Sequence, residues 1–367
     1  MKADCTMETI ADLDLQRDAW AGVPVRWPMQ EFDWIRLCAS TFSIRNLHVI
    51  SISGPGTGTT DTPPPPRAIA PLRIRHERAG VRRLVMLGGE ELFEPSDILW
   101  TDDRSLKDLA WRIAQSRLPV TLRRLPASSP AVEALRALHG RKGLVFCSPD
   151  VPAPIIHLDP SWSNAEAKLN SRRRSDLRRA GRKAEEFGDV KTEILTPSES
   201  EVDPLLDVAF EVESRSWKGK SGSALAMDEA RGRFYRDYAR AAARRGILRI
   251  CFLHLGMETA AMQIALVTNM AFWLLKIGYD ARFCKCSPGN LLIRETIQHA
   301  VRAGLSRYEF IGACEKWTKV WTPDAHDCVA VRIYPWSGAG IRALAVDGAA
   351  KLLRCLRQDS SNQRRLS

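Results

Sequence analysis

The sequence has no apolar run long enough to cross a membrane. Its longest apolar stretches, such as residues 247–257, fall far short of the ~20 residues that a spanning helix needs. The first 20 residues contain acids and lack an apolar core, so no secretory signal is visible. These two absences predict a chain without a membrane span that works in the cytoplasm.

Paired cysteines and metal-ligand motifs are also lacking. Cys284 and Cys286 have no second pair at zinc spacing, and His299 and His326 do not fit the usual ligand intervals. We therefore expect no metal. The odd number and irregular spacing of the cysteines favour reduced thiols over a disulfide framework; they lie at positions 5, 38, 147, 251, 284, 286, 314, 328 and 355.

Two common nucleotide-binding loops are missing. The sequence has no Walker loop, and no Gly-x-Gly-x-x-Gly follows an expected strand. A cysteine nucleophile with a histidine partner, for example Cys314 with His254 or His299, is left open by the residues alone.

The positive charge of the chain is concentrated in one segment. The formal net charge is +11, from 54 Lys and Arg against 43 Asp and Glu. Residues 172–183 hold seven basic residues and one acid, Asp176, which accounts for +6 of the +11. Either this is the solvated face of a helix or it contacts a phosphate or polyanion. No aromatics interleave with the arginines, which disfavours single-stranded nucleic acid as a partner.

The order of expected elements predicts a mixed α/β protein in two halves. Residues 1–159 and 160–357 form the halves, and residues 358–367 a flexible tail. In the second half a long helix is expected over residues 164–188. Three strands in quick succession predict an antiparallel meander, and a strand, helix and strand after it predict a parallel crossover. The expected strands span residues 247–255, 260–268, 271–280 and 307–313.

The segment Ser287-Pro288-Gly289-Asn290 stands between an expected strand and an amphipathic helix. The first amides of a helix have no internal partners and lie at the positive end of its dipole, so they can bind an anion. The alternative is a plain helix start capped by Ser287 or Asn290.

Polar residues flank this turn on both sides. In the strand before it, Lys276 and Asp280 share one side and Tyr279 lies on the other. Lys276 either neutralises a phosphate or carboxylate or lies on a solvated face. After the next expected strand, Glu315 could accept a proton from an attacking amine and Lys319 could balance developing negative charge. The alternative for Glu315 is a surface carboxylate paired with a neighbouring lysine.

Residues 211–322 resemble the GNAT superfamily of N-acetyltransferases. The motifs that carry the resemblance are SRRRSDLRRAGRKAEEFG, EVESRSWKGKSGSAL, FYRDYARAAARRGILRICFL and AFWLLKIGYDARFCKCSPGNLLIRETIQHAVRAGLSRYEFIGACEKWTKVWT. Within the superfamily they are most similar to CelD/BcsL-type acetyltransferases, associated with cellulose or exopolysaccharide biosynthesis, which in turn resemble Fem-type aminoacyltransferases.

The resemblance implies a tandem GNAT-like fold and a set of functional residues. The acyl-CoA pyrophosphate would lie on the loop from Cys286 to Leu292, which keeps one glycine where the family usually has more. The family's catalytic tract matches at Glu315, Trp317 and Trp321, but its lysine position is Thr318 here. Candidate cofactor-binding residues are Lys276, Ser287, Gly289, Asn290, Leu291 and Leu292; candidate substrate-binding residues are Arg174, Trp217, Tyr279, Asp280 and Trp317.

The resemblance also implies an activity. It predicts transfer of an acetyl or other acyl group from acyl-CoA to an amine or hydroxyl, on a small molecule or glycan of polysaccharide or envelope biosynthesis. Two alternatives remain: aminoacyl transfer from charged tRNA, or a GNAT fold that binds without turnover. The acceptor and the oligomeric state are not determined by the sequence.

Overall fold

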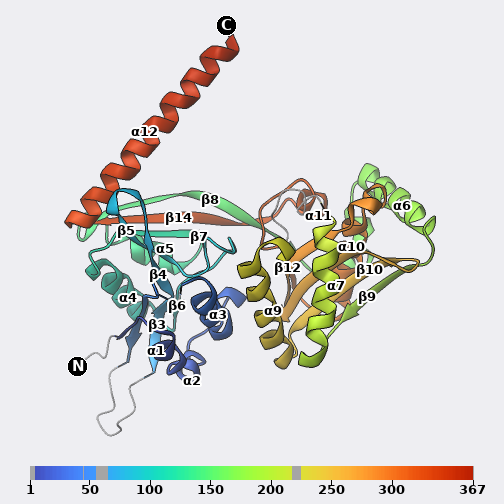
Figure 1. Cartoon of the computed structure of the whole chain (residues 1–367), viewed down its shortest axis with the longest axis horizontal. Coiled ribbons are helices and arrows are strands. Elements are labelled where there is room, and N and C mark those ends of the chain that lie inside the picture. Colours follow the sequence, from blue (N-terminus) through green and yellow to red (C-terminus); the bar gives the residue numbers. More distant parts are fainter. Residues whose placement is uncertain (1–4, 44, 55–64, 217–224, 367) are drawn as a thin grey trace. The chain divides into compact units, whose positions relative to one another are not determined.

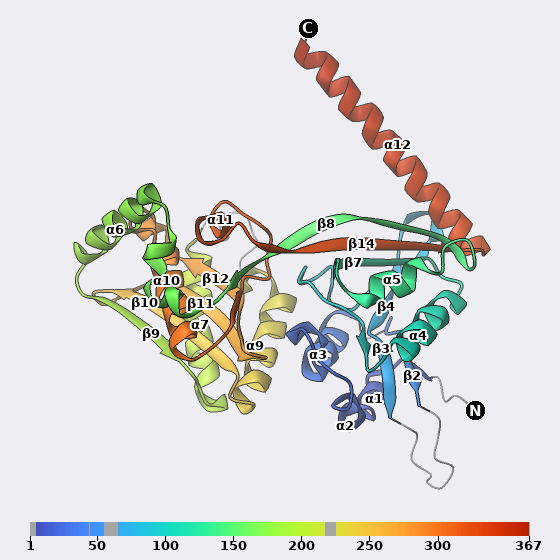
Figure 2. The same ribbon diagram turned by 180° about the vertical axis from the view of Figure 1, so that it is seen from behind.

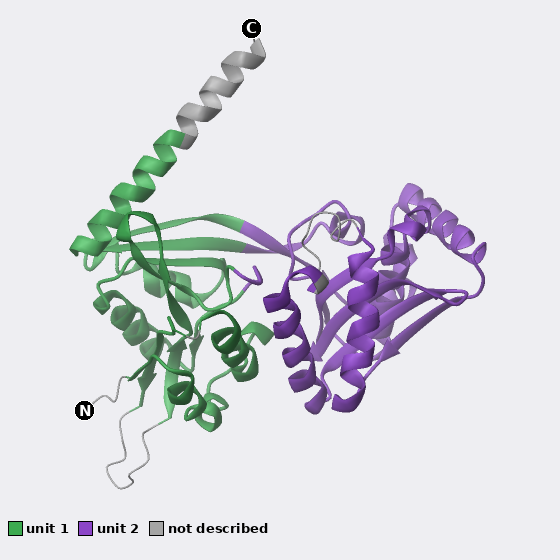
Figure 3. Cartoon of the chain, in the orientation of Figure 1, with its two compact units in different colours: residues 1–90, 96–150, 328–367 green, residues 91–95, 151–327 purple. Residues whose placement is uncertain are grey.

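The computed structural model describes residues 5–43, 45–54, 65–216 and 225–366, and leaves aside the side chains of residues 226 and 354–366. The chain divides into two compact units (Figure 3). Unit 1 comprises Met1–Glu90, Ser96–Asp150 and Cys328–Ser367, and unit 2 comprises Glu91–Pro95 and Val151–Asp327. Each unit is therefore built from more than one stretch of the chain. The prediction instead divides the chain at a single point, between residues 159 and 160.

Unit 1 combines two groups of strands with helices (Figure 1). One group is a four-stranded sheet in the order β1-β2-β3-β6, and the other has the order β4-β5-β7-β14-β8. The strands are β1 (Cys5–Met7), β2 (Val49–Ser53), β3 (Pro66–Ala70), β4 (Leu72–His76), β5 (Arg82–Met86), β6 (Leu99–Trp100), β7 (Val120–Pro126), β8 (Gly143–His157) and β14 (Ala325–Pro335). The helices are α1 (Ile10–Asp14), α2 (Arg17–Trp20), α3 (Phe32–Phe42), α4 (Asp103–Gln115), α5 (Pro130–Arg136) and α12 (Gly338–Leu366). Strands β8 and β14 each contain residues of both units.

Local sequence signals explain where the helices of unit 1 begin. Asp102 and Ser105 form a capping box at the start of α4, and the hydrogen bonds that Asp102 accepts lower its pKa to about 2. Helix α5 begins after Ser129, whose hydroxyl accepts the amide of Ala131, with Pro130 in the first turn. One apolar face of α4 packs into the core of this unit through Leu106, Leu109, Ala110 and Ile113.

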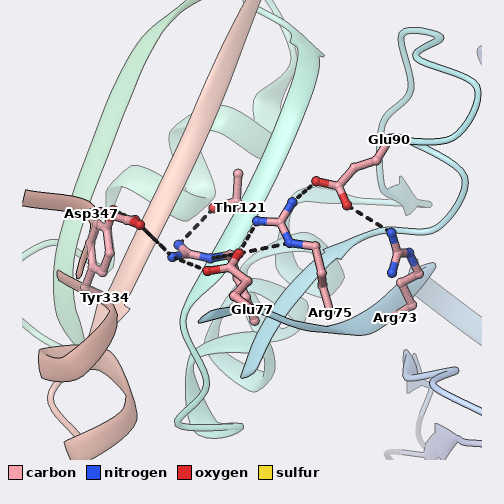
Figure 4. A network of polar contacts seen from close by, with 8 residues as sticks. Arg73, Arg75, Glu77, Glu90, Thr121, Tyr334 and Asp347 are labelled. Carbon is pink, nitrogen blue, oxygen red and sulfur yellow. Dashed lines mark hydrogen bonds and ion pairs between the residues drawn. The ribbon is translucent and has the colours of Figure 1, made fainter. Parts of the chain in front are cut away.

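An ion-pair network around the buried Arg83 joins α12 to the strands of unit 1 (Figure 4). Arg83 is 2% exposed, and its guanidinium donates to Thr121 Oγ1 (3.1 Å), Glu77 Oε1 (2.8 Å) and Asp347 Oδ2 (2.9 Å). The hydroxyl of Tyr334 also donates to Asp347. Burial is costly for a lone charge, so this pairing is what allows an arginine inside the unit. Arg73 and Arg75 extend the network to Glu90.

Unit 2 is built on the predicted meander. Strand β10 (Leu248–Leu255) pairs antiparallel with β11 (Glu258–Thr268), and β11 pairs antiparallel with β12 (Ala271–Tyr279). Strand β13 (Arg307–Glu309) then lies parallel to β12, so the predicted crossover is also confirmed. The order within this unit is β8-β13-β12-β11-β10-β9, with β9 (Val190–Leu195) at the edge.

Helices cover both faces of this sheet (Figures 1 and 2). Helices α7 (Val202–Ser214) and α9 (Glu229–Arg244) pack on one face, and α10 (Pro288–Arg302) packs on the other. Helix α6 (Ser171–Glu185) lies against α10, and the short α11 (Thr318–Trp321) follows β13.

The long helix predicted over residues 164–188 is wrong in its first turns. Residues Pro160–Lys168 form a 3-10 segment instead, and helix α6 begins only at Ser171, where the side chain of Asn170 accepts a hydrogen bond from the amide of Arg173. Leu177, Ala180 and Ala184 form the buried stripe of α6. Phe187 lies beyond its end and is 51% exposed.

Each unit contains a crossover between parallel strands. In unit 1 the antiparallel pair β4 and β5 leads through the segment Glu91–Pro95, strand β6 and helix α4 to β7, which lies parallel to β5. In unit 2 the antiparallel pair β11 and β12 leads through α10 to β13, which lies parallel to β12. In unit 2 this strand–helix–strand crossover places the start of α10 shortly after the end of β12.

Candidate active site

Strands β12 and β13 pair only at one end. Their parallel pairing covers Ala271–Trp273 opposite Arg307–Glu309, and the described chain shows no pairing between them beyond it. The register between β11 and β12 shifts at Leu275, since Leu274 is opposite Ala265 and Lys276 is opposite Ile264. An extra residue of this kind bends a strand. The second half of β12 therefore has β11 on one side and no strand on the other.

A cavity of about 650 Å³ occupies unit 2 at this opening. Its wall comes from the second half of β12, the start of α10, the chain after β13 and the segment Glu91–Pro95. Three of the lining side chains carry charge, namely Glu94, Lys276 and Glu315, and most of the others are apolar, aromatic or glycine. A mainly apolar cavity with a few polar groups is typical of a small-molecule site.

Few backbone amides at the start of α10 are available to bind an anion. Pro288 has no N–H, and the amides of Asn290 and Leu291 both donate to the carbonyl of Ser287, at 2.9 and 3.2 Å. The amide of Gly289 makes no hydrogen bond to any residue that the structure describes. Ser287 is the residue before the helix, but its side chain makes no capping hydrogen bond. The helix start therefore offers one amide, that of Gly289, to the cavity.

Unusual backbone conformations surround the cavity. Phe93 and Ser287 line it with φ values of 58° and 45°, in the left-handed region that non-glycine residues rarely adopt. Ile311, between the lining residues Phe310 and Gly312, has φ 47°, and the Gly312 amide donates to the Phe310 carbonyl at 2.5 Å. Such conformations persist only where the surrounding structure enforces them, and they gather at functional sites.

Most residues of the predicted site are brought together here. Glu315 Oε2 accepts a hydrogen bond from the indole of Trp317 (2.8 Å) rather than pairing with a lysine, and Asn290 Oδ1 accepts one from the indole of Trp321 (3.1 Å). The lining side chains and backbones that were predicted from sequence are Lys276, Tyr279, Ser287, Gly289, Asn290, Glu315 and Trp317.

Other predicted residues lie away from the cavity lining. Leu291 and Leu292 are buried in the core of unit 2, and Lys319 is exposed on α11. Asp280 caps the 3-10 turn at Ala281–Cys286 and pairs with Arg282 at 2.8 Å. Burial raises the pKa of Asp280, but hydrogen bonds from Arg282 outweigh this and hold the pKa below its usual value.

The remaining substrate candidates lie on α6 and outside the described chain. Arg174 is half-buried on α6, and it is not among the lining residues of the cavity. Neighbouring arginines are engaged within the protein, since Arg178 bonds Glu166 (3.1 Å) and Arg179 bonds Asp176 (2.7 Å). Trp217 lies outside the described residues.

Sequence reasoning missed the segment Glu91–Pro95. Leu92, Phe93 and Glu94 line the cavity although they precede β12 by about 180 residues and belong to no motif of the resemblance. Glu94 is 8% exposed, which is rare for a carboxylate and is the one signal that points to it. That signal exists only in the folded chain.

Gly278 lets α7 approach β12 behind the cavity, and its substitution is the first testable prediction. A Cβ at this position would lie 3.1 Å from both Cα and Cβ of Glu213. Gly278→Ala should therefore lower the free energy of unfolding by about 1–3 kcal/mol through overpacking. Urea denaturation measures this; Gly181→Ala, with nothing within 4 Å of its Cβ, is the control and should not destabilise the protein.

Part of unit 2 matches a known domain family. Residues 171–319 match the sequence model of the acetyltransferase (GNAT) domain. They cover most of unit 2, which accordingly has the fold of a GNAT acetyltransferase domain. No curated protein sequence matches the chain.

Solved structures are similar over both units. A conserved protein of unknown function from Bacteroides thetaiotaomicron VPI-5482 is 11% identical, with 91% of this chain and 99% of that chain covered and a TM-score of 0.53. The C-terminal domain (DUF2156) of a putative lysylphosphatidylglycerol synthetase from Agrobacterium fabrum is 14% identical, with coverage of 94% and 97% and a TM-score of 0.52. A tandem GNAT protein from the clavulanic acid biosynthesis pathway is 14% identical, with coverage of 90% and 98% and a TM-score of 0.42.

The predicted mixed α/β fold class is confirmed, and unit 2 has the GNAT-like fold that the resemblance implied. At these identities the similarity is one of fold. Within the described residues, no helix is long and apolar enough to cross a membrane. The described side chains also contain no cluster of three or more histidine, cysteine or acidic groups arranged to hold a metal.

Proposed function

We propose that this protein is an acyltransferase that binds an acyl-CoA in the cavity of unit 2. The observation that carries the proposal is the open side of β12 next to the Gly289 amide, on the wall of a single cavity. A strand without a neighbour can hydrogen-bond the extended amide-containing arm of CoA in place of a strand. The positive end of α10 then favours the diphosphate.

Transfer in such a site is direct. The acceptor amine or hydroxyl attacks the thioester carbonyl, the acyl carbon–sulfur bond breaks, and the sulfur leaves as the thiol after proton transfer. Glu315 is positioned to take the acceptor's proton because its Oε2 is held by the Trp317 indole on the cavity wall. Positioning of the two reactants supplies much of the rate. A glycan is the acceptor suggested by the resemblance to CelD/BcsL-type enzymes.

Calorimetric titration tests the proposal. We expect acetyl-CoA, or an acyl-CoA with a longer chain, to bind one site per chain, with affinity that falls at high salt because the diphosphate contact is electrostatic. Free CoA is the control for the acyl group. Absence of binding by acetyl-CoA and by every longer acyl-CoA would remove the proposal. Binding without thiol release in the presence of candidate acceptors would instead favour a protein that binds without turnover.

Two observations favour a second donor, an aminoacyl-tRNA. The start of α10 offers one amide rather than several, and residues 172–183 carry a charge of +6. This donor has its own test, because RNA binding through several phosphates weakens steeply as salt rises. Tight tRNA binding with such a slope, together with absent acyl-CoA binding, would select aminoacyl transfer.

A further inference from the structure

Three segments of unit 1 that are far apart in the sequence come together at the start of α12. The backbone amide of Trp336 donates to the carbonyl of Lys142 at 3.1 Å. The hydroxyl of Ser337 donates to the carbonyl of Arg117 at 2.7 Å. We call the three segments the end surface of unit 1; they are residues 111–118, 136–143 and 336–342.

The end surface carries only positive charge. It has six Lys and Arg residues and no Asp or Glu, so its formal charge is +6. None of the six forms an ion pair with a residue that the structure describes. Unpaired cations gathered in one place create a positive potential that attracts an anionic partner. The six are Arg112, Arg117, Arg136, Arg141, Lys142 and Arg342.

The end surface also holds two exposed tryptophans. Trp111 is 42% exposed and Trp336 is 54% exposed, whereas the other tryptophans that the structure describes are buried or half-buried. Nζ of Lys142 lies 3.7 Å from the ring centroid of Trp111. The indole N–H of Trp336 donates to the carbonyl of Gly140 at 3.3 Å. Because this N–H is bonded within the protein, the Trp336 ring exposes mainly carbon to the outside.

Helix α12 continues the same combination of apolar and basic residues. Ile341 is 61% exposed and Leu352 is 62% exposed. They are about three helical turns apart and therefore lie on one face of the helix. Residues 351–366 add five Lys and Arg residues and one acid, Asp359. Apolar and basic residues combined along one helix are typical of binding to a membrane surface.

The contacts of the end surface favour lipid over nucleic acid. Binding of single-stranded nucleic acid needs open aromatic faces on which bases stack, but Lys142 lies over the ring of Trp111. Exposed aliphatic side chains such as Ile341 match acyl chains better than phosphates or bases. A membrane with anionic lipids offers negative headgroups above hydrocarbon, which is the combination that this surface complements.

We propose that the end surface and α12 dock on a membrane whose lipids have anionic headgroups. Trp336 and Ile341 enter the headgroup region, where tryptophan is favoured, and the lysine and arginine side chains contact the headgroups. This surface belongs to unit 1, so the proposal does not depend on the acyl-CoA site proposed for unit 2.

Vesicle sedimentation with the full chain tests the proposal. Vesicles of phosphatidylcholine alone are compared with vesicles of an equimolar mixture of phosphatidylcholine and phosphatidylserine. We expect binding to the mixture only, with affinity that falls as salt rises because the headgroup contact is electrostatic. Bromine-labelled acyl chains in the mixture should quench part of the tryptophan fluorescence, and Trp336→Phe should reduce that quenching.

Substitutions separate the charged and the apolar contributions. Arg141→Glu should weaken binding to the mixture at least ~5-fold, because one cation near an anionic membrane contributes roughly that factor. Trp336→Ala should weaken it ~10-fold, the factor that burial of roughly 60 Å² of apolar surface gives. Ile341→Gln is a second apolar variant on the exposed side of α12 and should act in the same direction, even if Trp336→Ala fails to fold.

Matched controls come from unit 2. Arg172 on α6 and Met257 in the turn between β10 and β11 are both exposed. Arg172→Glu and Met257→Ala make comparable changes of charge and apolar surface away from the end surface, and neither should change binding to the mixture.

Four outcomes would overturn the proposal. The first two are absence of binding to the mixture and equal binding to both kinds of vesicle. The third is equal weakening by Arg141→Glu and Arg172→Glu with none from the apolar variants, which would mean that net charge alone adsorbs the protein. The fourth is preference for poly-glutamate or a DNA oligonucleotide over the mixture, lost in Trp336→Ala, which would assign the end surface to an acidic macromolecule.

Discussion

Gly289→Asp should lower the affinity for acetyl-CoA at least ~100-fold while leaving the protein as stable as before or slightly more stable. The new carboxylate would stand at the start of α10 on the cavity wall. The amide of residue 289 is the one amide at this helix start that makes no hydrogen bond to a described residue. Repulsion between like charges about 4 Å apart is of the order of 4 kcal/mol at an effective dielectric constant near 20, which is enough for this loss.

The same substitution favours folding for two reasons. An acid in the first turn of a helix is stabilising by about 0.3–1 kcal/mol, and glycine is a poor helix residue. Space is also available, because a Cβ at Gly289 would lie 3.8 Å from the nearest atoms of Ile277 and Tyr279, an ordinary contact. Calorimetry gives the affinity and thermal unfolding gives the stability.

Gly289→Ala is the matched control for Gly289→Asp. It adds the same Cβ without the charge and should retain most of the acetyl-CoA affinity. If both variants lose affinity equally, the effect is steric and the Gly289 amide is not the anion site. If Gly289→Asp binds acetyl-CoA like the natural protein, the diphosphate lies elsewhere.

Asp97→Asn should stabilise unit 1 at pH 8 by an amount on the order of 2–4 kcal/mol. Asp97 is 2% exposed, and burial raises its pKa to about 7, although hydrogen bonds from Ser129 and from the Ile98 amide (2.9 Å) oppose the rise. At pH 8 the native protein therefore holds a buried carboxylate that the unfolded chain would expose to water. The amide of asparagine keeps an oxygen acceptor at this position and carries no charge.

The pH dependence has a definite sign. Between the ordinary pKa of 3.8 that Asp97 has in the unfolded chain and its pKa of about 7 in the folded protein, the native state binds more protons than the unfolded state. The contribution of Asp97 is therefore most favourable below pH ~4, falls as the pH rises towards 7, and is constant above. Denaturation of the natural protein and of Asp97→Asn at pH 5 and pH 8 measures it. A stability difference that does not grow from pH 5 to pH 8 would contradict the raised pKa.

Much of unit 2 could be predicted from local patterns. The three closely spaced strands could only form a meander, and the alternation along β12 was already visible in the sequence. In the structure Gly278 packs against Glu213 on α7, whereas Ile277 and Tyr279 face Gly289 on α10, as alternation requires. Pro288 and Gly289 also marked the start of α10 correctly.

Local patterns were less informative about which side chains line the cavity. Leu291 and Leu292 follow the helix start in sequence, but helical geometry turns them into the core. Asp280 follows Tyr279, yet its carboxylate is held by Arg282 and by the turn that it caps. Adjacency in sequence cannot distinguish a residue that lines a cavity from one that supports it.

The sequence by itself determined the three meander strands, the start of α10, the parallel crossover and the resemblance to GNAT acetyltransferases, because each depends on residues close together in the chain. The tertiary structure alone decided that β12 and β13 separate after three residue pairs, and that Glu94 lies beside Lys276 across about 180 residues of sequence. The physical reason is that side-chain periodicity and helix capping depend on residues only a few positions apart. Burial and ion pairing instead depend on the positions of segments that only folding brings together.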